Sequence, residues 1–308
     1  MSRCPITYES IGEGRYSQKA LRKLSPRLDE LLDLPYSVEE QIHEAEKRAT
    51  KMSIQGVQPK LSAKLNIKGK VFEVVDTGGC FILKPQNQRY RCLPENEAIT
   101  MHLASAVGIE TPFHGMIYAK DSTLTYFIKR FDRRGYRKRA LEDFAQLAGL
   151  SRETKYNYSM ERLVPILEQY CTFPKLEKLK LFRLTLFNYL VGNEDAHLKN
   201  FSLIRINRKV GLSPAYDLLN TTIAMKGVTE ELALPLNGNK SNLNRDLFFD
   251  YYASDRLNLT ERAINQVDQE FKSSIGSWKS LLEKSFLTEE LKQQYWEVIS
   301  QRRAILEL

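Results

Sequence analysis

The chain has 308 residues, of which 42% are hydrophobic, and it carries a formal net charge of +8. This length allows a substantial buried core, organised as one two-lobed unit or as two small domains. No run of 18 or more apolar residues is present, and residues 1–5 lack the apolar stretch of a signal peptide. A cytoplasmic protein with no membrane partner is therefore expected.

The four cysteines and four histidines are scattered along the sequence. They form no CxxC pair and no HExxH motif, which excludes the usual zinc sites and a disulfide framework. The positive charge suits an anionic partner such as a nucleotide, a nucleic acid or an acidic protein. Charge alone does not choose among these partners.

The first part of the chain has the patterns of a small sheet packed with helices. Residues 37–48 begin with capping-box spacing and predict a short helix. A second helix is predicted from residue 94 to Gly108, because Ile99, Leu103 and Val107 recur at four-residue spacing. Strands are predicted, the first three as an antiparallel meander, at residues 61–67, 71–75, 81–84, 116–118 and 124–130.

From residue 141 onward the pattern is mainly helical. A hairpin is predicted from strands at 201–204 and 209–212, and the tail from residue 260 is helical again. The expected fold class is α+β, with a small antiparallel-sheet N-lobe over residues 1–134 and a mainly helical C-lobe over residues 135–308. Before the hairpin lies a long amphipathic helix, with one apolar face predicted from Leu176, Leu179, Phe182, Leu186 and Leu190.

The clearest chemical pattern is an aspartate and an asparagine separated by four residues, Asp195 and Asn200, directly after this helix. In phosphoryl-transfer enzymes such an aspartate orients or accepts the proton of the attacking hydroxyl, and the asparagine oxygen holds Mg²⁺. Asp217, beyond the predicted hairpin, would add a second metal ligand. Each residue alone could be a cap or a turn, but the combination favours a catalytic site.

Two further residues of this motif, His197 and Lys199, are candidates for supporting roles. Lys199 could neutralise charge on a transferred phosphate, and His197 could contact ATP or brace the loop. Near the first strands, Lys84 ends an apolar strand and Glu97 lies one turn into the next helix. Such a pair positions ATP phosphates in kinases, although a surface lysine lying along a sheet is the simpler alternative.

The segment at 53–61 leads into the first strand, and its backbone amides could cover nucleotide phosphates. With Gly56 as its single glycine it matches neither GxGxxG nor GxxxxGK[ST]. An ordinary turn before a strand is the alternative.

Taken in order, five blocks of the sequence resemble those of HipA-type kinases of bacterial toxin–antitoxin modules: 53–60, 95–97, 193–202, 214–217 and 234–238. The resemblance implies a two-lobed protein-kinase-like fold and a serine/threonine kinase toxin that uses ATP and Mg²⁺. The position of the first block resembles the shorter HipT form, which lacks the N-terminal subdomain of HipA.

The resemblance also implies a set of roles. Asp195 would be the catalytic aspartate, assisted by Lys199, with Asn200 and Asp217 as magnesium ligands. Lys84 would bind phosphate with Glu97 as its partner, and Ser53 would be autophosphorylated. The expected contacts to ATP are completed by residues Ser53, Ile54, Gln55, Gly56, Val57 and His197.

The partners implied by the resemblance are an aminoacyl-tRNA synthetase, of the tryptophanyl or glutamyl type, and two antitoxins. Phosphorylation of a synthetase serine would stop translation. A small HipS-like protein would restrain the kinase, and a HipB-like protein would bind DNA, so that the chain itself meets DNA only indirectly.

Two alternatives remain open from the sequence. A small-molecule phosphotransferase of the aminoglycoside type uses a similar Asp, Asn and Asp set, although the basic charge suits a polycationic substrate poorly. A non-catalytic DNA-binding or repressor-assisting module would explain the charge, but the sequence shows no helix-turn-helix, RNP or zinc signature.

Overall fold

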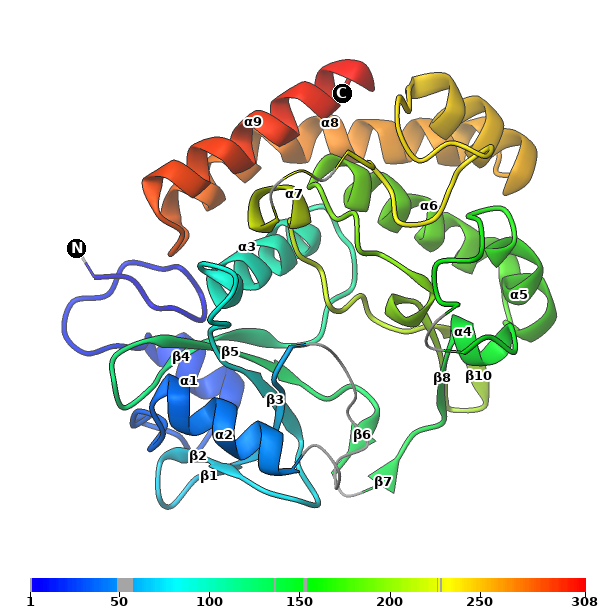
Figure 1. The fold of residues 1–308 in the computed structure, drawn as a ribbon. Coiled ribbons are helices and arrows are strands. Elements are labelled where there is room, and N and C mark those ends of the chain that lie inside the picture. The colour runs from blue at the N-terminus through cyan, green and yellow to red at the C-terminus, as the bar shows by residue number, and fades with distance from the viewer. Residues whose placement is uncertain (1, 49–57, 136, 152–153, 226, 228) are drawn as a thin grey trace. The chain divides into compact units, whose positions relative to one another are not determined.

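The computed structural model describes residues 2–48, 58–135, 137–151, 154–225, 227 and 229–308 (Figure 1). The chain divides into two compact units. The first comprises residues up to Ile99 together with Pro112–Arg137 and Glu283–Thr288. The second comprises Thr100–Thr111, Lys138–Leu282 and Glu289–Leu308.

The first unit is built on a five-stranded antiparallel sheet with the order β2-β1-β3-β5-β4 (Figure 1). The predicted strands are all present, with β4 beginning two residues earlier than expected. Their bounds are β1 Leu61–Asn66, β2 Val71–Val74, β3 Phe81–Lys84, β4 His114–Tyr118 and β5 Leu124–Lys129.

The predicted meander of the first three strands is wrong, because β3 pairs with β1 and not with β2. Ala63 of β1 pairs with Val74 of β2 on one side and with Phe81 of β3 on the other. The chain therefore crosses β1 between β2 and β3. Gly79 permits this crossing, since a Cβ there would lie 2.0 Å from Ser62 Oγ and 3.1 Å from the backbone N and O of Ala63.

The first unit also contains α1 Gln18–Leu24, α2 Val38–Arg48 and the start of α3 Leu93–Ala106. No helix or strand was predicted before residue 37, yet α1 contributes Ala20, Leu21 and Leu24 to the core of this unit. Ser17 caps α1 by accepting a hydrogen bond from the Ala20 N–H at 3.2 Å. This cap, followed by apolar residues one helical turn apart, was a signal present in the sequence.

The second unit is mainly helical, with a small sheet of order β10-β9-β8. The predicted hairpin is confirmed in β9 Ser202–Ile206 and β10 Lys209–Leu212, whose tight turn places Asn207 and Arg208 at positive φ. β8 Leu141–Asp143 was not predicted and pairs with β9. The helical elements are α4 Phe144–Leu147, α5 Leu163–Tyr170, α6 Pro174–Leu190, η1 Leu198–Asn200, α7 Thr221–Ala224, the π-helical η2 Leu247–Arg256, α8 Glu261–Lys284 and α9 Glu289–Ile305.

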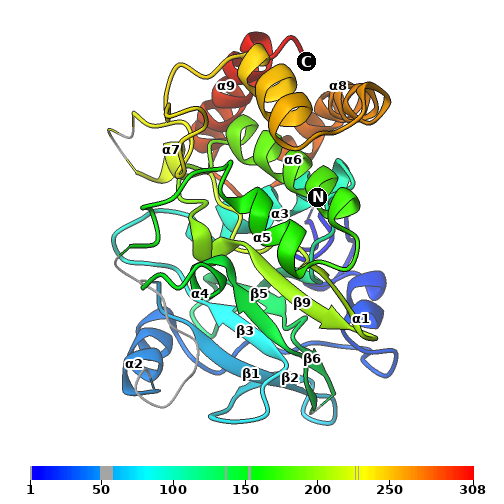
Figure 2. The ribbon, with the colours of Figure 1, turned by 90° about the vertical axis from the view of Figure 1, so that its right-hand side faces the viewer.

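The predicted single apolar face of α6 is partly wrong. Leu176 is 58% exposed, whereas nearly every residue from Leu181 to Leu190 is buried. The cause is that α6 contacts α5, β10, η2 and α9 and so is covered on several sides (Figure 2). A helix enclosed in this way is apolar around most of its circumference.

The two-stranded ribbon of β6 Arg133–Arg134 and β7 Arg137–Lys138 lies at the junction of the two units in the sequence. In the part of the chain that the structure describes, no helix has both the length and the apolar character needed to cross a membrane.

Replacing Gly79 tests the crossing over β1. Gly79→Ala is expected to lower the free energy of unfolding by about 1–3 kcal/mol, because the added methyl group overlaps Ser62 and the Ala63 backbone. Urea unfolding followed by circular dichroism measures the change. Gly12→Ala is the control, since its Cβ would meet no described atom within 4 Å. Equal unfolding free energies of the two variants would contradict the crossing.

Candidate active site

The loop that carries Asp195 begins where α6 ends, and its backbone is fixed by close packing. Gly192 has a φ of +73°, and a Cβ on it would lie 2.6 Å from Thr222 Oγ1 and 2.9 Å from Asn220 Oδ1. The Thr221 N–H donates to the Gly192 carbonyl at 2.7 Å. The start of α7 is therefore pressed against the loop, and glycine is the residue that this contact requires.

A buried ion pair fixes the residue immediately before Asp195. The Glu194 carboxylate accepts from Arg302 Nη2 at 2.7 Å, and from the hydroxyls of Thr221 at 2.8 Å and Thr222 at 2.5 Å. Arg302 Nη1 donates to the Tyr189 carbonyl at 2.5 Å, so α9 also holds the end of α6. Glu194 is 7% exposed and Arg302 is 9% exposed. A carboxylate buried in this way needs an ion pair and hydrogen bonds to compensate for its lost hydration.

Asp195 itself is partly exposed and accepts a hydrogen bond from the hydroxyl of Tyr156. The Tyr156 ring meets the His197 ring edge-on, with centroids 5.1 Å apart. Burial lowers the pKa of His197, with the nearby Asp195 charge opposing this shift. His197 is thereby favoured in its neutral form beside the aspartate.

Asn200 and Asp217 are connected through Tyr216. The Tyr216 hydroxyl donates to the Lys199 carbonyl at 2.8 Å and shares a 2.5 Å hydrogen bond with Ser202 Oγ. Tyr216 therefore links the segment that carries Asp217 to Lys199 and Ser202, which stand on either side of Asn200 and Phe201. Asp217 has a φ of +53°, a left-handed conformation that aspartate adopts more readily than most residues and that is common at functional sites.

The oxygens of this loop fit Mg²⁺. Asn200 Oδ1 is buried and has no hydrogen-bond partner among the described residues. A buried carbonyl oxygen of this kind calls for a partner, and amide and carboxylate oxygens are ligands that Mg²⁺ accepts. No group of three or more His, Cys, Asp and Glu with metal-binding geometry occurs in the described ranges. The predicted binding of an ion by Asn200 and Asp217, together with phosphate oxygens, stays a prediction.

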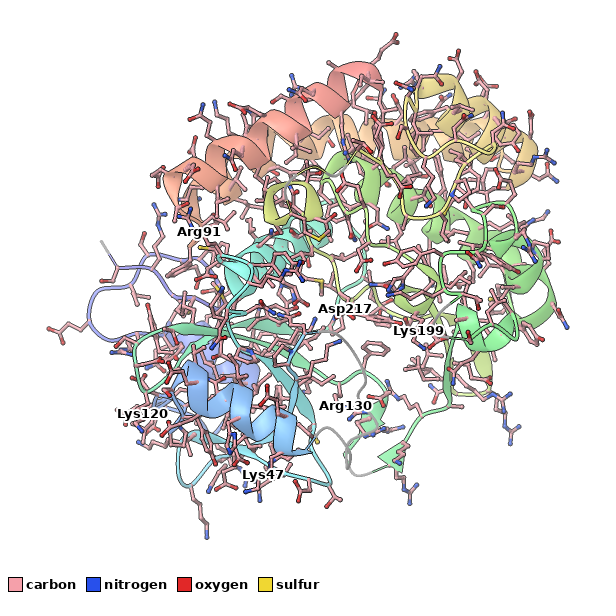
Figure 3. All side chains as sticks on the ribbon, in the orientation of Figure 1. Lys47, Arg91, Lys120, Arg130, Lys199 and Asp217 are labelled. Carbon is pink, nitrogen blue, oxygen red and sulfur yellow. The ribbon has the colours of Figure 1, made fainter. Side chains whose placement is uncertain are left out.

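Lys199 forms an ion pair with Asp143, with 2.7 Å between Nζ and Oδ2. Asp143 also caps α4 by accepting from the Gln146 N–H at 2.9 Å. Lys199 and Asp217 both belong to the second unit (Figure 3). The predicted role of Lys199 in the reaction stays a prediction.

Lys84 and Glu97 lie in the first unit and are brought together as predicted. Lys84 Nζ lies 2.5 Å from Glu97 Oε1, and each residue is 3% exposed. The Lys84 ammonium also lies 5.6 Å from the centroid of the Tyr126 ring. The alternative of a surface lysine is therefore wrong, because α3 presents Glu97 to the end of β3 within the protein interior.

The remaining predicted contacts to ATP, Ser53, Ile54, Gln55, Gly56 and Val57, lie outside the described residues. Their roles stay predictions from the sequence.

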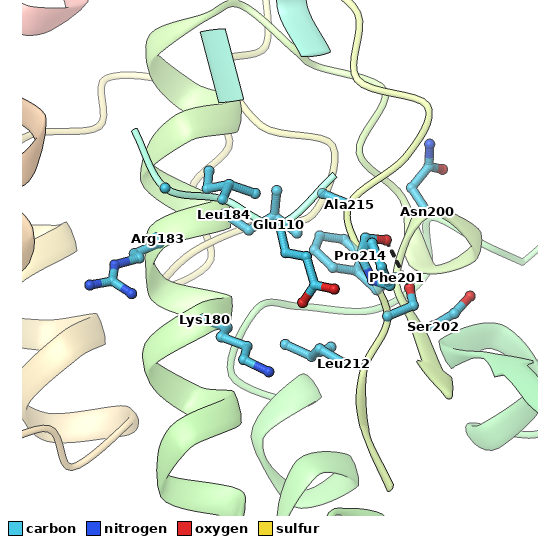
Figure 4. Close-up of a pocket in the computed structure, with 13 residues that line it drawn as sticks. Glu110, Lys180, Arg183, Leu184, Asn200, Phe201, Ser202, Leu212, Pro214 and Ala215 are labelled. Atoms are coloured by element: carbon cyan, nitrogen blue, oxygen red, sulfur yellow. Dashed lines mark hydrogen bonds between the residues drawn. The ribbon is translucent and has the colours of Figure 1, made fainter. Parts of the chain in front are cut away.

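A cavity of about 210 Å³ lies beside this loop in the second unit, and Asn200 is at its rim (Figure 4). Figure 4 shows the Asn200 amide directed away from Glu110 and Lys180, which line the other side of the cavity. The cavity is therefore behind the candidate metal ligand and not on the side to which the amide points.

Four residues that hold this site were not predicted from the sequence: Tyr156, Glu194, Tyr216 and Arg302. Glu194 directly precedes Asp195 and Tyr216 directly precedes Asp217. Their position next to predicted site residues was a signal that could have identified them. Arg302 is one of several basic residues in the last helix, and nothing local distinguishes it from Arg303. Its role comes from a contact across 108 positions of the chain.

The Glu194–Arg302 pair predicts a large cost for losing the arginine. Arg302→Met is expected to destabilise the chain by about 3–5 kcal/mol, because Glu194 remains buried without its charge partner. Arg303→Met changes the next residue of the same helix, which is half-buried and makes no ion pair among the described residues, and is expected to change stability by less than about 0.5 kcal/mol. Thermal and urea unfolding of both variants measures this, and equal stabilities would show that the pair does not anchor the loop.

The amino-acid sequence is similar to those of several known proteins. The protein Y4dM of Sinorhizobium fredii is 35% identical over 221 residues, which cover 63% of this chain and 51% of that protein. The serine/threonine-protein kinase toxin HipA of Shewanella oneidensis is 28% identical over 209 residues, covering 61% of this chain and 47% of HipA. The chain thus spans about half the length of these relatives.

The fold resembles that of the HipA chain in a complex of Shewanella oneidensis HipA, HipB and operator DNA. The TM-score is 0.71 at 22% identity, and the match covers 98% of this chain and 78% of that one. The predicted protein-kinase-like fold class is confirmed by this likeness. The family described as HipA-like C-terminal domain matches residues 52–278, which is well over half of the sequence, and the chain belongs to this family.

Proposed function

We propose that the chain is a Mg-ATP-dependent serine/threonine protein kinase of the HipA toxin type. The observation that carries the proposal is the bonded framework of the second unit, which places Asp195 and Asn200 on one loop and joins it to Asp217 through Tyr216. This is the set of groups that phosphoryl transfer from ATP requires. Membership of the HipA-like family supports the same reaction.

In this reaction Asp195 would accept the proton of a substrate serine while the serine oxygen attacks the γ-phosphorus of ATP. The new O–P bond forms as the bond to the β-phosphate oxygen breaks, and ADP leaves. Lys84, held by Glu97, would bind the ATP phosphates. Lys199 would contribute positive charge near the transferred phosphate, with Asp143 holding its ammonium at the loop.

Asn200 and Asp217 would hold Mg²⁺, which when bound neutralises charge on the β- and γ-phosphates. The unsatisfied, buried Oδ1 of Asn200 supports this assignment. His197, favoured in its neutral form by burial, would contact the nucleotide without adding charge.

The substrate that we propose is a serine of an aminoacyl-tRNA synthetase, so that phosphorylation stops translation and growth. A HipB-like DNA-binding antitoxin and a small HipS-like protein would be partners, and DNA would be met through the HipB-like protein. The location would be cytoplasmic. These proposals come from the family resemblance and from the HipB-bound structure of the Shewanella oneidensis relative.

Replacing Asp195 tests the reaction. Asp195→Ala is expected to lower transfer of labelled γ-phosphate from Mg-ATP to a mixture of aminoacyl-tRNA synthetases by at least about 100-fold, because the base is lost. Asp250→Ala, an exposed aspartate of the same unit, should transfer like wild type. When an aminoglycoside is added to the same assay, label on that compound and on no protein would favour a small-molecule phosphotransferase. Equal transfer by Asp195→Ala and wild type would overturn the role of Asp195.

Autophosphorylation of Ser53 is tested separately. Ser53→Ala is expected to remove label from the kinase itself while leaving transfer to the synthetase. Ser53→Asp is expected to weaken ATP binding, since phosphate at this position would add about −1.5 to −2 charge next to the segment proposed to cover the nucleotide. Mass spectrometry and titration calorimetry with Mg-ATP measure these effects. Label that persists on Ser53→Ala at another residue would contradict the assignment.

A further inference from the structure

The contact between Tyr156 and Asp195 has the form of a contact between an enzyme base and its substrate. The Tyr156 hydroxyl donates to Asp195 Oδ1. Among the described side chains, Tyr156 is the hydrogen-bond donor to this carboxylate. A serine hydroxyl that is to be phosphorylated must donate to the same carboxylate, since the base has to be within hydrogen-bond reach of the proton that it takes.

The surroundings of Tyr156 keep its hydroxyl protonated and directed at Asp195. Burial, together with the hydrogen bond to Asp195, raises the pKa of Tyr156. The Tyr156 ring packs edge-on against the His197 ring. The Lys155 carbonyl accepts a long 3.4 Å hydrogen bond from the Leu198 N–H. These contacts join the segment around Tyr156 to the loop of Asp195.

Tyr156 stands at the border between the protein interior and solvent. Tyr156 is 37% exposed, so part of its ring already meets solvent. The segment is anchored further along the chain, where the Met160 N–H donates to the Pro235 carbonyl at 3.0 Å and Met160 is buried. Tyr156 is thus held by its contacts with Asp195 and His197, close to the point where Met160 fixes the segment.

We propose that Tyr156 acts as a built-in pseudosubstrate, whose hydroxyl occupies the position of the acceptor hydroxyl on Asp195 and leaves when a substrate serine binds. This inference rests on the proposed kinase function and adds its regulation. It makes Tyr156 a competitor of every acceptor, including water. Phosphate transfer to water from Mg-ATP is therefore held down in the resting protein.

The test compares Tyr156→Phe with Tyr158→Phe, two changes that each remove one hydroxyl. Tyr158 lies two residues away, with the Arg162 guanidinium 4.0 Å from its ring centroid. The probe is Mg-ATP alone, and release of inorganic phosphate is measured. Tyr156→Phe is expected to raise hydrolysis about tenfold, the factor that one hydrogen bond to a charged group provides, whereas Tyr158→Phe should match wild type. Adding Asp195→Ala to Tyr156→Phe should abolish the increase.

A second measurement reports the contact without relying on activity. A double-mutant cycle of Tyr156→Phe and Asp195→Ala in urea unfolding should give a coupling of roughly three- to tenfold in the unfolding equilibrium constant. Coupling together with faster hydrolysis supports the proposal. Slower or unchanged hydrolysis in Tyr156→Phe overturns it, as does an absence of coupling. Coupling in a protein that neither hydrolyses ATP nor transfers phosphate would establish the contact but overturn the kinase function, and with it the pseudosubstrate role.

Discussion

The position of the candidate catalytic loop depends on the buried ion pair between Glu194 and Arg302. A carboxylate can remain in the interior only if a charge partner and further hydrogen bonds compensate its lost hydration. Glu194 receives these from Arg302, Thr221 and Thr222. Because Glu194 directly precedes Asp195, the last long helix of the chain fixes the backbone on which the base is presented. Packing of α9 and the chemistry of the loop are thus coupled through one side chain.

The same principle organises the rest of the second unit. Neighbouring side chains hold the segments of the site: Tyr216 joins the segments of Asn200 and Asp217, and Asp143 pairs with Lys199 while capping α4. Two atoms of the loop, Asn200 Oδ1 and His197 Nδ1, are buried without a hydrogen-bond partner among the described residues. Both atoms belong to residues that are predicted to contact Mg²⁺ or ATP, which fits a loop prepared for its ligands.

Local features of the fold could be predicted from the sequence, and long-range ones could not. Runs of strand-forming residues between turn residues predicted the strands, but such runs do not say which strand is the neighbour, so the crossing at Gly79 was missed. The spacing of Asp195 and Asn200 located the loop, and the pairing of Lys84 with Glu97 followed from a strand and the next helix. Arg302 and Tyr156 carry no local signal, because their roles arise from contacts between distant segments.

The assignment of Asn200 and Asp217 as metal ligands is tested most directly by a crystal structure with Mn²⁺ and a non-hydrolysable ATP analogue. Anomalous scattering would locate the ion. The expected position lies about 2.1 Å from Asn200 Oδ1 and from a carboxylate oxygen of Asp217, with the remaining ligands supplied by phosphate and water. An ion bound elsewhere, or a nucleotide bound while Asn200 Oδ1 stays without a ligand, would contradict the account of this loop as a site of phosphoryl transfer.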